Sequence, residues 1–157
     1  MASVVAKEPL VFRSRLALRY KDALEELFYF NSNQSVVQEG LEYVIEHFGI
    51  PRIVEDSGEI FFKLEGNDNT QTLFALENVS GKEQLVGVMI YTRSSTDTIS
   101  LIHLAVADPD VIDYHFERNA LTAALFDHMR LIAKKINDVT RLHFLYGKKN
   151  QYVRVRK

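Results

Sequence analysis

The stretch LFALENVSGKEQLVGVMIYTRSSTDTISLIHLAVADPD, residues 73–110, decides the fold that this sequence predicts. Its apolar residues come in three runs, which we interpret as strands over Leu73–Glu77, Leu85–Tyr91 and Thr98–Ala107. The two segments between the runs are short enough to be hairpin connections. The stretch therefore predicts an antiparallel meander of three strands.

A helix and a further strand follow the meander. ALTAALFDHMRLIAKKI, residues 120–136, predicts a helix with one apolar side, formed by Leu121, Leu125, His128, Leu131 or Ile132, and Ile136. TRLHFLY lies in the expected strand Val139–Tyr146. A strand reached through a helical crossover is expected to run parallel to its neighbour, in a right-handed unit. The sheet should therefore be mixed but mostly antiparallel.

The N-terminal part predicts a strand and two helices. The strand covers Leu10–Leu18, and helical spacing begins at Tyr20 with Leu24, Leu27 and Phe28. Ser35 and Gln38 form a capping box that starts the second helix. Gly49 and Pro51 supply its stop.

Two short strands complete the expected elements, one over Glu59–Leu64 and a last edge strand over Gln151–Arg156. No repeat, low-complexity tract or internal linker interrupts the sequence. At 157 residues and 46% hydrophobic, the chain has the size of one ordinary domain. We expect a single α+β domain, residues 1–157, with helices flanking the sheet.

Composition excludes several classes of function. The chain has no cysteine, so disulfides, thiolate metal sites and a cysteine nucleophile are ruled out. Lys7 and Glu8 interrupt the N-terminus before a signal-length apolar run accumulates, and no window approaches the roughly 18 apolar residues of a membrane span. We expect a cytoplasmic protein without a membrane partner.

Charge is unevenly distributed along the chain. Five basic residues and no acidic residue stand from Gly147 onward, which leaves 14 basic and 21 acidic side chains in the remainder. A basic tail can bind phosphate backbones, but the acidic body would repel the rest of a duplex. Nucleic acid is therefore not an expected partner.

The order of elements resembles the GCN5-related N-acetyltransferase (GNAT) family, whose members use acyl-coenzyme A. The residues that carry the resemblance are VFRSRLALRYKDALEELFYF and SVVQEGLEYVIEHF, then FALEN, the glycine-bearing LVGVMIYTR and ISLIHLAVADP. The likeness covers nearly the whole chain. It implies a GNAT-like fold, N-acyltransferase activity, and acetyl-coenzyme A or a longer acyl-coenzyme A as cofactor.

The resemblance also implies where the cofactor would bind. Backbone groups at Val106 and Ala107 would hold the pantetheine arm, and a turn that opens the crossover helix would meet the phosphates, over Arg118, Asn119, Ala120, Leu121, Thr122 and Ala123. In the family this turn reads Gln/Arg-x-x-Gly-x-Gly/Ala, because its glycines let backbone N–H groups approach the pyrophosphate at the helix N-terminus.

Two registers of that turn are open in this chain. One places Arg118 first, with Leu121 and Ala123 at the glycine positions. The other places Glu117 first, followed by Ala120 and Thr122. The defining glycine is missing in both, so the phosphate loop is degenerate.

Acidic residues gather before the same helix, at Asp108, Asp110, Asp113 and Glu117. A carboxylate beside a pyrophosphate disfavours binding by about 1 kcal/mol or more. Acidic residues at a helix N-terminus also stabilise its dipole without any ligand. The sequence thus leaves two functions open. One is an acyltransferase-like enzyme of low or no activity, and the other is a non-catalytic GNAT-fold module for dimerisation or regulation.

Three residues are weak candidates for catalysis. His103 lies on the third meander strand, and a histidine ordinarily titrates in the range of a general base. Glu77 ends the first meander strand, and Tyr152 faintly resembles the family's tyrosine acid. Tyr91 ends the second meander strand and could line an acceptor cleft. The five histidines show no metal-ligand spacing, so no metal is expected.

The end of the chain departs from the family pattern. Only eleven residues follow Tyr146, too few for the family's last helix and closing pair of strands. A second copy of the chain could complete that edge, which makes a homodimer a possible assembly.

A pair of substitutions tests the phosphate loop. If residues 118–123 meet the cofactor's phosphates, Arg118→Ala should weaken acyl-coenzyme A binding and Glu117→Ala should strengthen it, each because of the charge removed. Calorimetric titration of both variants measures the two changes. If neither changes the affinity, the loop is vestigial.

Overall fold

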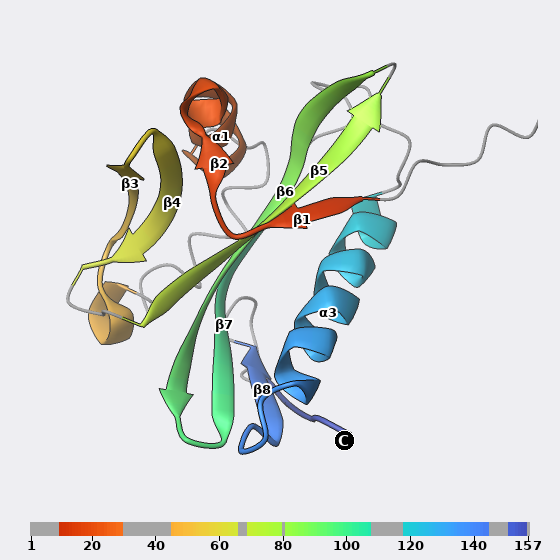
Figure 1. The fold of residues 1–157 in the computed structure, drawn as a ribbon. Coiled ribbons are helices and arrows are strands. Elements are labelled where there is room, and N and C mark those ends of the chain that lie inside the picture. Colours follow the sequence, from red (N-terminus) through yellow and green to blue (C-terminus); the bar gives the residue numbers. More distant parts are fainter. Residues whose placement is uncertain are drawn as a thin grey trace, which may run out of the picture.

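A computed structural model of the protein describes residues 10–29, 45–65, 69–79, 81–107, 118–144 and 151–156. The elements are β1 (Val11–Arg13), β2 (Leu16–Ala17), η1 (Leu18–Tyr20), α1 (Lys21–Tyr29), β3 (Pro51–Asp56), β4 (Glu59–Leu64), β5 (Thr70–Val79), β6 (Lys82–Ser95), β7 (Thr98–Val106), α3 (Arg118–Lys134), β8 (Arg141–Phe144) and β9 (Gln151–Arg154). They form one six-stranded sheet in the order β1-β5-β6-β7-β8-β9 and one three-stranded sheet in the order β2-β4-β3 (Figure 1).

The strands of the large sheet have the relative directions that the sequence predicts. Neighbouring strands pair antiparallel except β7 and β8, which are parallel. The helix α3 connects these two strands in the chain. The mixed α+β fold with a mostly antiparallel sheet is therefore confirmed.

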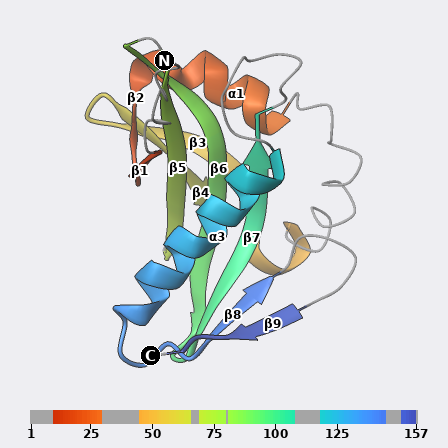
Figure 2. The same ribbon diagram turned by 90° about the vertical axis from the view of Figure 1, so that its right-hand side faces the viewer.

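Helices lie on opposite faces of the large sheet (Figures 1 and 2). α3 covers one face, where a Cβ added at Gly87 would lie 3.0 Å from Leu125 Cδ1, so glycine lets this helix approach the sheet closely. α1 and the small sheet cover the other face, where Phe28 packs against His103 with ring centroids 4.4 Å apart. One hydrophobic core cluster includes residues of both sheets and both helices.

Two N-terminal predictions are corrected by the structure. The single opening strand expected over Leu10–Leu18 is two strands that join different sheets, because β1 pairs with β5 and β2 pairs with β4. The sequence prediction also missed β3, where Pro51 served only as a helix stop. Pro51 is the first strand residue, a position at which proline is tolerated.

The predicted helices are present among the described residues, but the buried side of α3 differs from the predicted one. Residues 45–48 are helical and Gly49 ends them with φ 99°, as expected, whereas the capping box at Ser35 and Gln38 lies outside the described residues. On α3 the fully buried side chains are Leu121, Leu125, Met129 and Ala133. Leu131 is exposed and His128 is half-buried, stacked on Phe12 at 4.1 Å. The apolar side therefore runs through Met129 and Ala133 rather than His128 and Leu131, while Ile132 and Ile136 pack against the core as expected.

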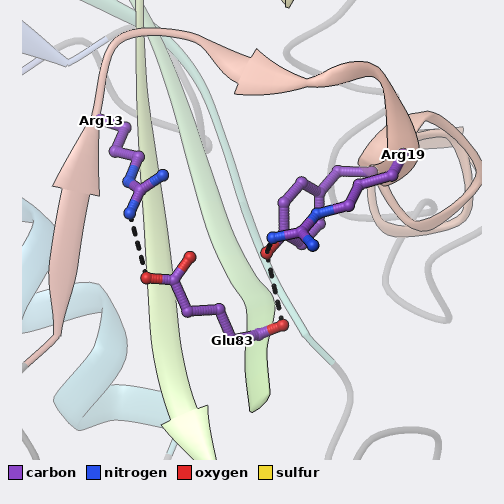
Figure 3. A network of polar contacts seen from close by, with 4 residues as sticks. Arg13, Arg19 and Glu83 are labelled. Carbon is purple, nitrogen blue, oxygen red and sulfur yellow. Dashed lines mark hydrogen bonds and ion pairs between the residues drawn. The ribbon is translucent and has the colours of Figure 1, made fainter. Parts of the chain in front are cut away.

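A polar network fastens the N-terminal segment to the β5–β6 hairpin (Figure 3). Arg13 of β1 forms an ion pair with Glu83 of β6 at 3.0 Å. Tyr20 donates a hydrogen bond to the Glu83 backbone oxygen at 3.4 Å, and Arg19 donates to the Tyr20 hydroxyl at 3.2 Å. One residue of β6 thus contacts both the β1 strand and the turn that leads into α1.

Two threonine side chains of β5 in the large sheet form hydrogen bonds with backbone groups of β4 in the small sheet. β2 pairs with β4 only at Ile60 and Glu59, so the backbone of Phe62 and Leu64 extends beyond β2. The Phe62 N–H donates to the Thr72 hydroxyl at 3.0 Å, and the Leu64 N–H donates to the Thr70 hydroxyl at 3.2 Å. Buried backbone groups need such partners. These side chains therefore join the two sheets.

Thr72→Val should destabilise the protein, because valine keeps the shape but leaves the buried Phe62 N–H without its acceptor. The expected loss in the free energy of unfolding is about 1–3 kcal/mol, measured by urea denaturation. Thr72→Ser is the matched control, since it keeps the hydroxyl and should retain more of the stability. If valine is as stable as threonine, the side-chain link between the sheets contributes nothing.

Candidate functional site at the end of β7

The backbone at the end of β7 has a defined orientation. The Ala107 N–H donates to the Val86 oxygen of β6 at 2.8 Å. Because successive peptide groups of a strand point to opposite sides, the N–H and C=O of Val106 point towards the β8 side. Both residues are buried, at 5% and 2% exposure. Val106 and Ala107, predicted to hold the pantetheine arm, thus present backbone groups to different sides of the strand.

β8 accompanies β7 only at the start of that strand. The parallel ladder runs from Thr98–Arg141 to Leu101–Phe144 and includes no later described residue of β7. Every described residue of β8 takes part in this ladder. The outward groups of Val106 therefore lie beyond the part of β7 that is paired with β8.

The start of α3 distinguishes the residues proposed to meet phosphate. Leu121 is fully buried in the core, whereas Ala120 and Ala123 are exposed and Thr122 is half-buried. The helix begins at Arg118, and the side chains of Arg118 and Asn119 lie outside the described part. The acidic positions from Asp108 to Glu117 also lie outside it.

His103 is a sealed core residue. It pairs with Ile90 of β6, is 3% exposed and packs its ring against Phe28. Its Nε2 has no hydrogen-bond partner among the described residues. Burial lowers the pKa of His103 from 6.5 to about 4. The imidazole is therefore neutral at physiological pH.

A β-bulge determines which face His103 occupies. Ile90 pairs with His103 but Tyr91 pairs with Leu101, so Ile102 is an extra residue on β7. Because Ile90 and Tyr91 face opposite sides of the sheet, His103 and Leu101 do so as well. Strict alternation along β7 would place Leu101 on the same face as His103, and the bulge is the reason that it does not.

The second histidine of the sheet is part of a stacked group. His143 lies parallel to the Tyr152 ring, with centroids 4.1 Å apart and a 4° interplanar angle, and the Arg141 guanidinium lies 4.6 Å from the Tyr152 centroid. Burial and the nearby Arg141 lower the pKa of His143. Since His143 is in register with Ser100, it lies on the same sheet face as His103, yet the two rings have different neighbours.

The remaining candidates lie elsewhere. Glu77 is 1% exposed, on β5. Tyr91 lines a groove of about 640 Å³ with Gln71, Arg93 and Ile132, next to the C-terminal end of α3. Burial raises the pKa of Tyr91. The structure thus stacks Tyr152 on His143 and buries Glu77. It places Tyr91 at the opposite end of α3 from the predicted phosphate loop.

In the part of the chain that the structure describes, no group of three or more His, Asp or Glu side chains is arranged to hold a metal ion. None of the described helices combines the length and apolar character needed to cross a bilayer.

His103 should make the protein acid-sensitive. The unfolded imidazole, with a pKa near 6.5, binds a proton that the folded one rejects until about pH 4. The contribution of neutral His103 to stability is therefore fully present above pH 6.5. The free energy of unfolding falls as the pH drops towards 4, by about 2 kcal/mol at pH 5.

Urea denaturation at pH 7.5 and at pH 5 measures this loss. His103→Leu should abolish most of it and be no less stable at pH 7.5, because it removes a buried polar atom without a partner. His143→Leu replaces a half-buried histidine on the same face, and this variant should retain most of the loss of stability between pH 7.5 and pH 5. An equal pH dependence in wild type and His103→Leu would contradict the assignment.

The end of β7 therefore combines outward-facing backbone groups, a neighbouring strand that is paired only with its first part, and the nearby start of a helix. Compared with known proteins, the chain matches no family model, no curated protein and no solved structure.

Proposed function

We propose that the chain is a GNAT-like protein that binds acyl-coenzyme A at the end of β7 and is an N-acyltransferase of low activity. The observation that carries the proposal is the short parallel ladder between β7 and β8. Its last pair is Leu101 and Phe144, and β7 continues to Val106 without a described strand on its β8 side. An extended ligand with amide groups, such as a pantetheine arm, would lie along the outward backbone groups of β7 as a strand-like partner.

The start of α3 supports one register of the phosphate loop. A residue that replaces a phosphate-contacting glycine must face the ligand. Ala120 is exposed and fits this requirement, whereas Leu121 is fully buried and does not. We therefore favour the register Glu117, Ala120 and Thr122. In it, helix N–H groups would still favour an anion, and Glu117 would weaken its binding.

Acyl transfer at this site would need a base. The amine nitrogen of an acceptor attacks the thioester carbonyl, a C–N bond forms, the C–S bond breaks to release the thiol, and the amine loses a proton. His103 is a poor acceptor for that proton, because it is sealed from solvent and its pKa is about 4. Glu77 is equally closed. Slow turnover is therefore part of the proposal.

The second candidate function is a non-catalytic module for dimerisation or regulation. The sealed His103 favours it specifically, because a catalytic base must reach its substrate. The missing glycine and the acidic residues before α3 favour it too. In this case the GNAT-like fold would serve as a scaffold for partner contacts.

Calorimetric titration with acetyl-coenzyme A and with a longer acyl-coenzyme A tests the first function. We expect binding that Ala120→Glu weakens at least about fivefold, which corresponds to a like-charge penalty of about 1 kcal/mol. Ala123→Glu is the matched control, because it adds the same charge at another exposed alanine of α3 and should weaken binding less.

The outcomes separate the two functions. A larger effect of Ala123→Glu would restore the register that begins at Arg118. The absence of binding heat from a folded wild type would overturn the acyltransferase proposal. If the molar mass measured in the same sample is that of a dimer, the module function would be favoured instead.

A further inference from the structure

The sheet ends in an open edge at β9. β9 pairs with β8, and none of the described strands pairs with its other side. The Val155 N–H donates to the Thr140 oxygen at 2.8 Å, which fixes the alternation of peptide groups along the strand. The N–H and C=O groups of Tyr152 and Arg154 accordingly point away from β8. They form a row of strand-type donors and acceptors at the edge.

A groove of about 820 Å³ runs beside this edge, between α3 and β9. Its lining residues are Arg130, Lys134, Thr140, Val153, Arg154, Val155 and Arg156. Four of the seven are basic and none is acidic. Val155 is buried and Val153 half-buried, so the groove also has an apolar component. The groove is separate from the end of β7 where the cofactor is proposed to bind.

Local roles account for only part of this charge. Lys134 stands in the last turn of α3, where a cation complements the helix dipole. Arg130 forms an exposed ion pair with Asp127 at 3.2 Å, and such pairs contribute little. Neither explanation applies to Arg154 and Arg156, which lie beyond any helix. The basic character of the groove therefore exceeds what fold stability requires, in a chain whose formal net charge is −2.

We propose that an extended acidic peptide segment of another protein binds here by adding a strand to β9. Its backbone would pair with the outward groups of Tyr152 and Arg154, and alternate side chains would lie on the two faces of the sheet. Acidic residues on the α3 face would meet Arg130 and Lys134. The alternate, aliphatic residues would lie on the opposite face beside Tyr152, because Val153 and Arg154 face opposite sides of the sheet. A peptide fits better than a nucleic acid, because a sheet edge offers hydrogen bonds in strand spacing and the acidic body repels a long polyanion.

Fluorescence anisotropy with a dye-labelled peptide of alternating glutamate and valine tests this inference. We expect saturable binding that weakens as salt is raised, and no binding of the corresponding lysine–valine peptide. Arg130→Glu combined with Lys134→Glu should weaken binding at least tenfold. Lys21→Glu combined with Lys82→Glu changes the net charge equally at exposed positions outside the groove, and should have a much smaller effect.

Two substitutions at one position separate strand addition from general attraction. Arg154→Ala removes only a charge, whereas Arg154→Pro also removes an outward N–H without breaking a hydrogen bond to β8. Strand addition predicts that proline weakens binding about fivefold or more beyond alanine, with both variants folded by circular dichroism. Equal affinities of the two variants would overturn it.

Two further results would also contradict the proposal. One is tighter binding of a single-stranded oligothymidylate than of the acidic peptide, which would identify a polyanion site. The other is a stable dimer whose dissociation is caused by Arg154→Pro, which would make the occupant of the edge a second copy of the chain. A failure of acyl-coenzyme A to bind leaves this inference untouched, because the two sites share no residue.

Discussion

Phe28 is the residue on which the assembly of this fold depends. Its ring lies 4.4 Å from the Phe62 ring of the small sheet and 4.4 Å from the His103 ring of the large sheet. α1 is thereby held between the two sheets, and burial of one such side chain contributes about 1.5–3 kcal/mol. The hydroxyls of Thr70 and Thr72 complete the same junction, because they satisfy backbone groups of β4 that none of the described strands reaches. Apolar packing and hydrogen bonding thus act at one place.

That junction limits what the chemistry at β7 can be. The bulge at Ile102 turns His103 onto the α1 face, where Phe28 covers it. A histidine on that face is neutral and shielded from solvent, so it is a packed core residue that is not placed to exchange protons with a substrate. The backbone groups at Val106 are not affected, because they point along the sheet rather than to either face. The fold therefore favours binding by backbone groups over catalysis by side chains.

The two ends of α3 have different characters. Its start lies near acidic positions in the sequence and is where the cofactor phosphates are proposed to bind, whereas its last turns lie beside the basic groove at β9. Charge that is nearly balanced over the whole chain is thus unevenly distributed along it. The two proposed sites share no residue.

The sequence by itself determined most of the large sheet. The apolar runs of β5, β6 and β7 and the period of α3 are local patterns, and local patterns follow from the geometry of strands and helices. They also predicted that β8 runs parallel to a neighbour, because a helical crossover returns the chain to the end of the sheet where the preceding strand began. For the site, the resemblance predicted Val106, Ala107 and the start of α3, and it left two registers open.

Only the tertiary structure decided the features that depend on contacts between distant residues. Leu10–Leu18 is split between two sheets because β5 and β4 pair with its two halves, and neither partner is visible in the local sequence. The bulge on β7 is a property of its register with β6, so the face of His103 could not be read from alternation alone. The burial of Leu121 beside the exposed Ala120 also depends on what packs against α3, so it could not be read from the sequence alone. Periodicity describes an element, whereas pairing and burial depend on what the rest of the chain packs against it.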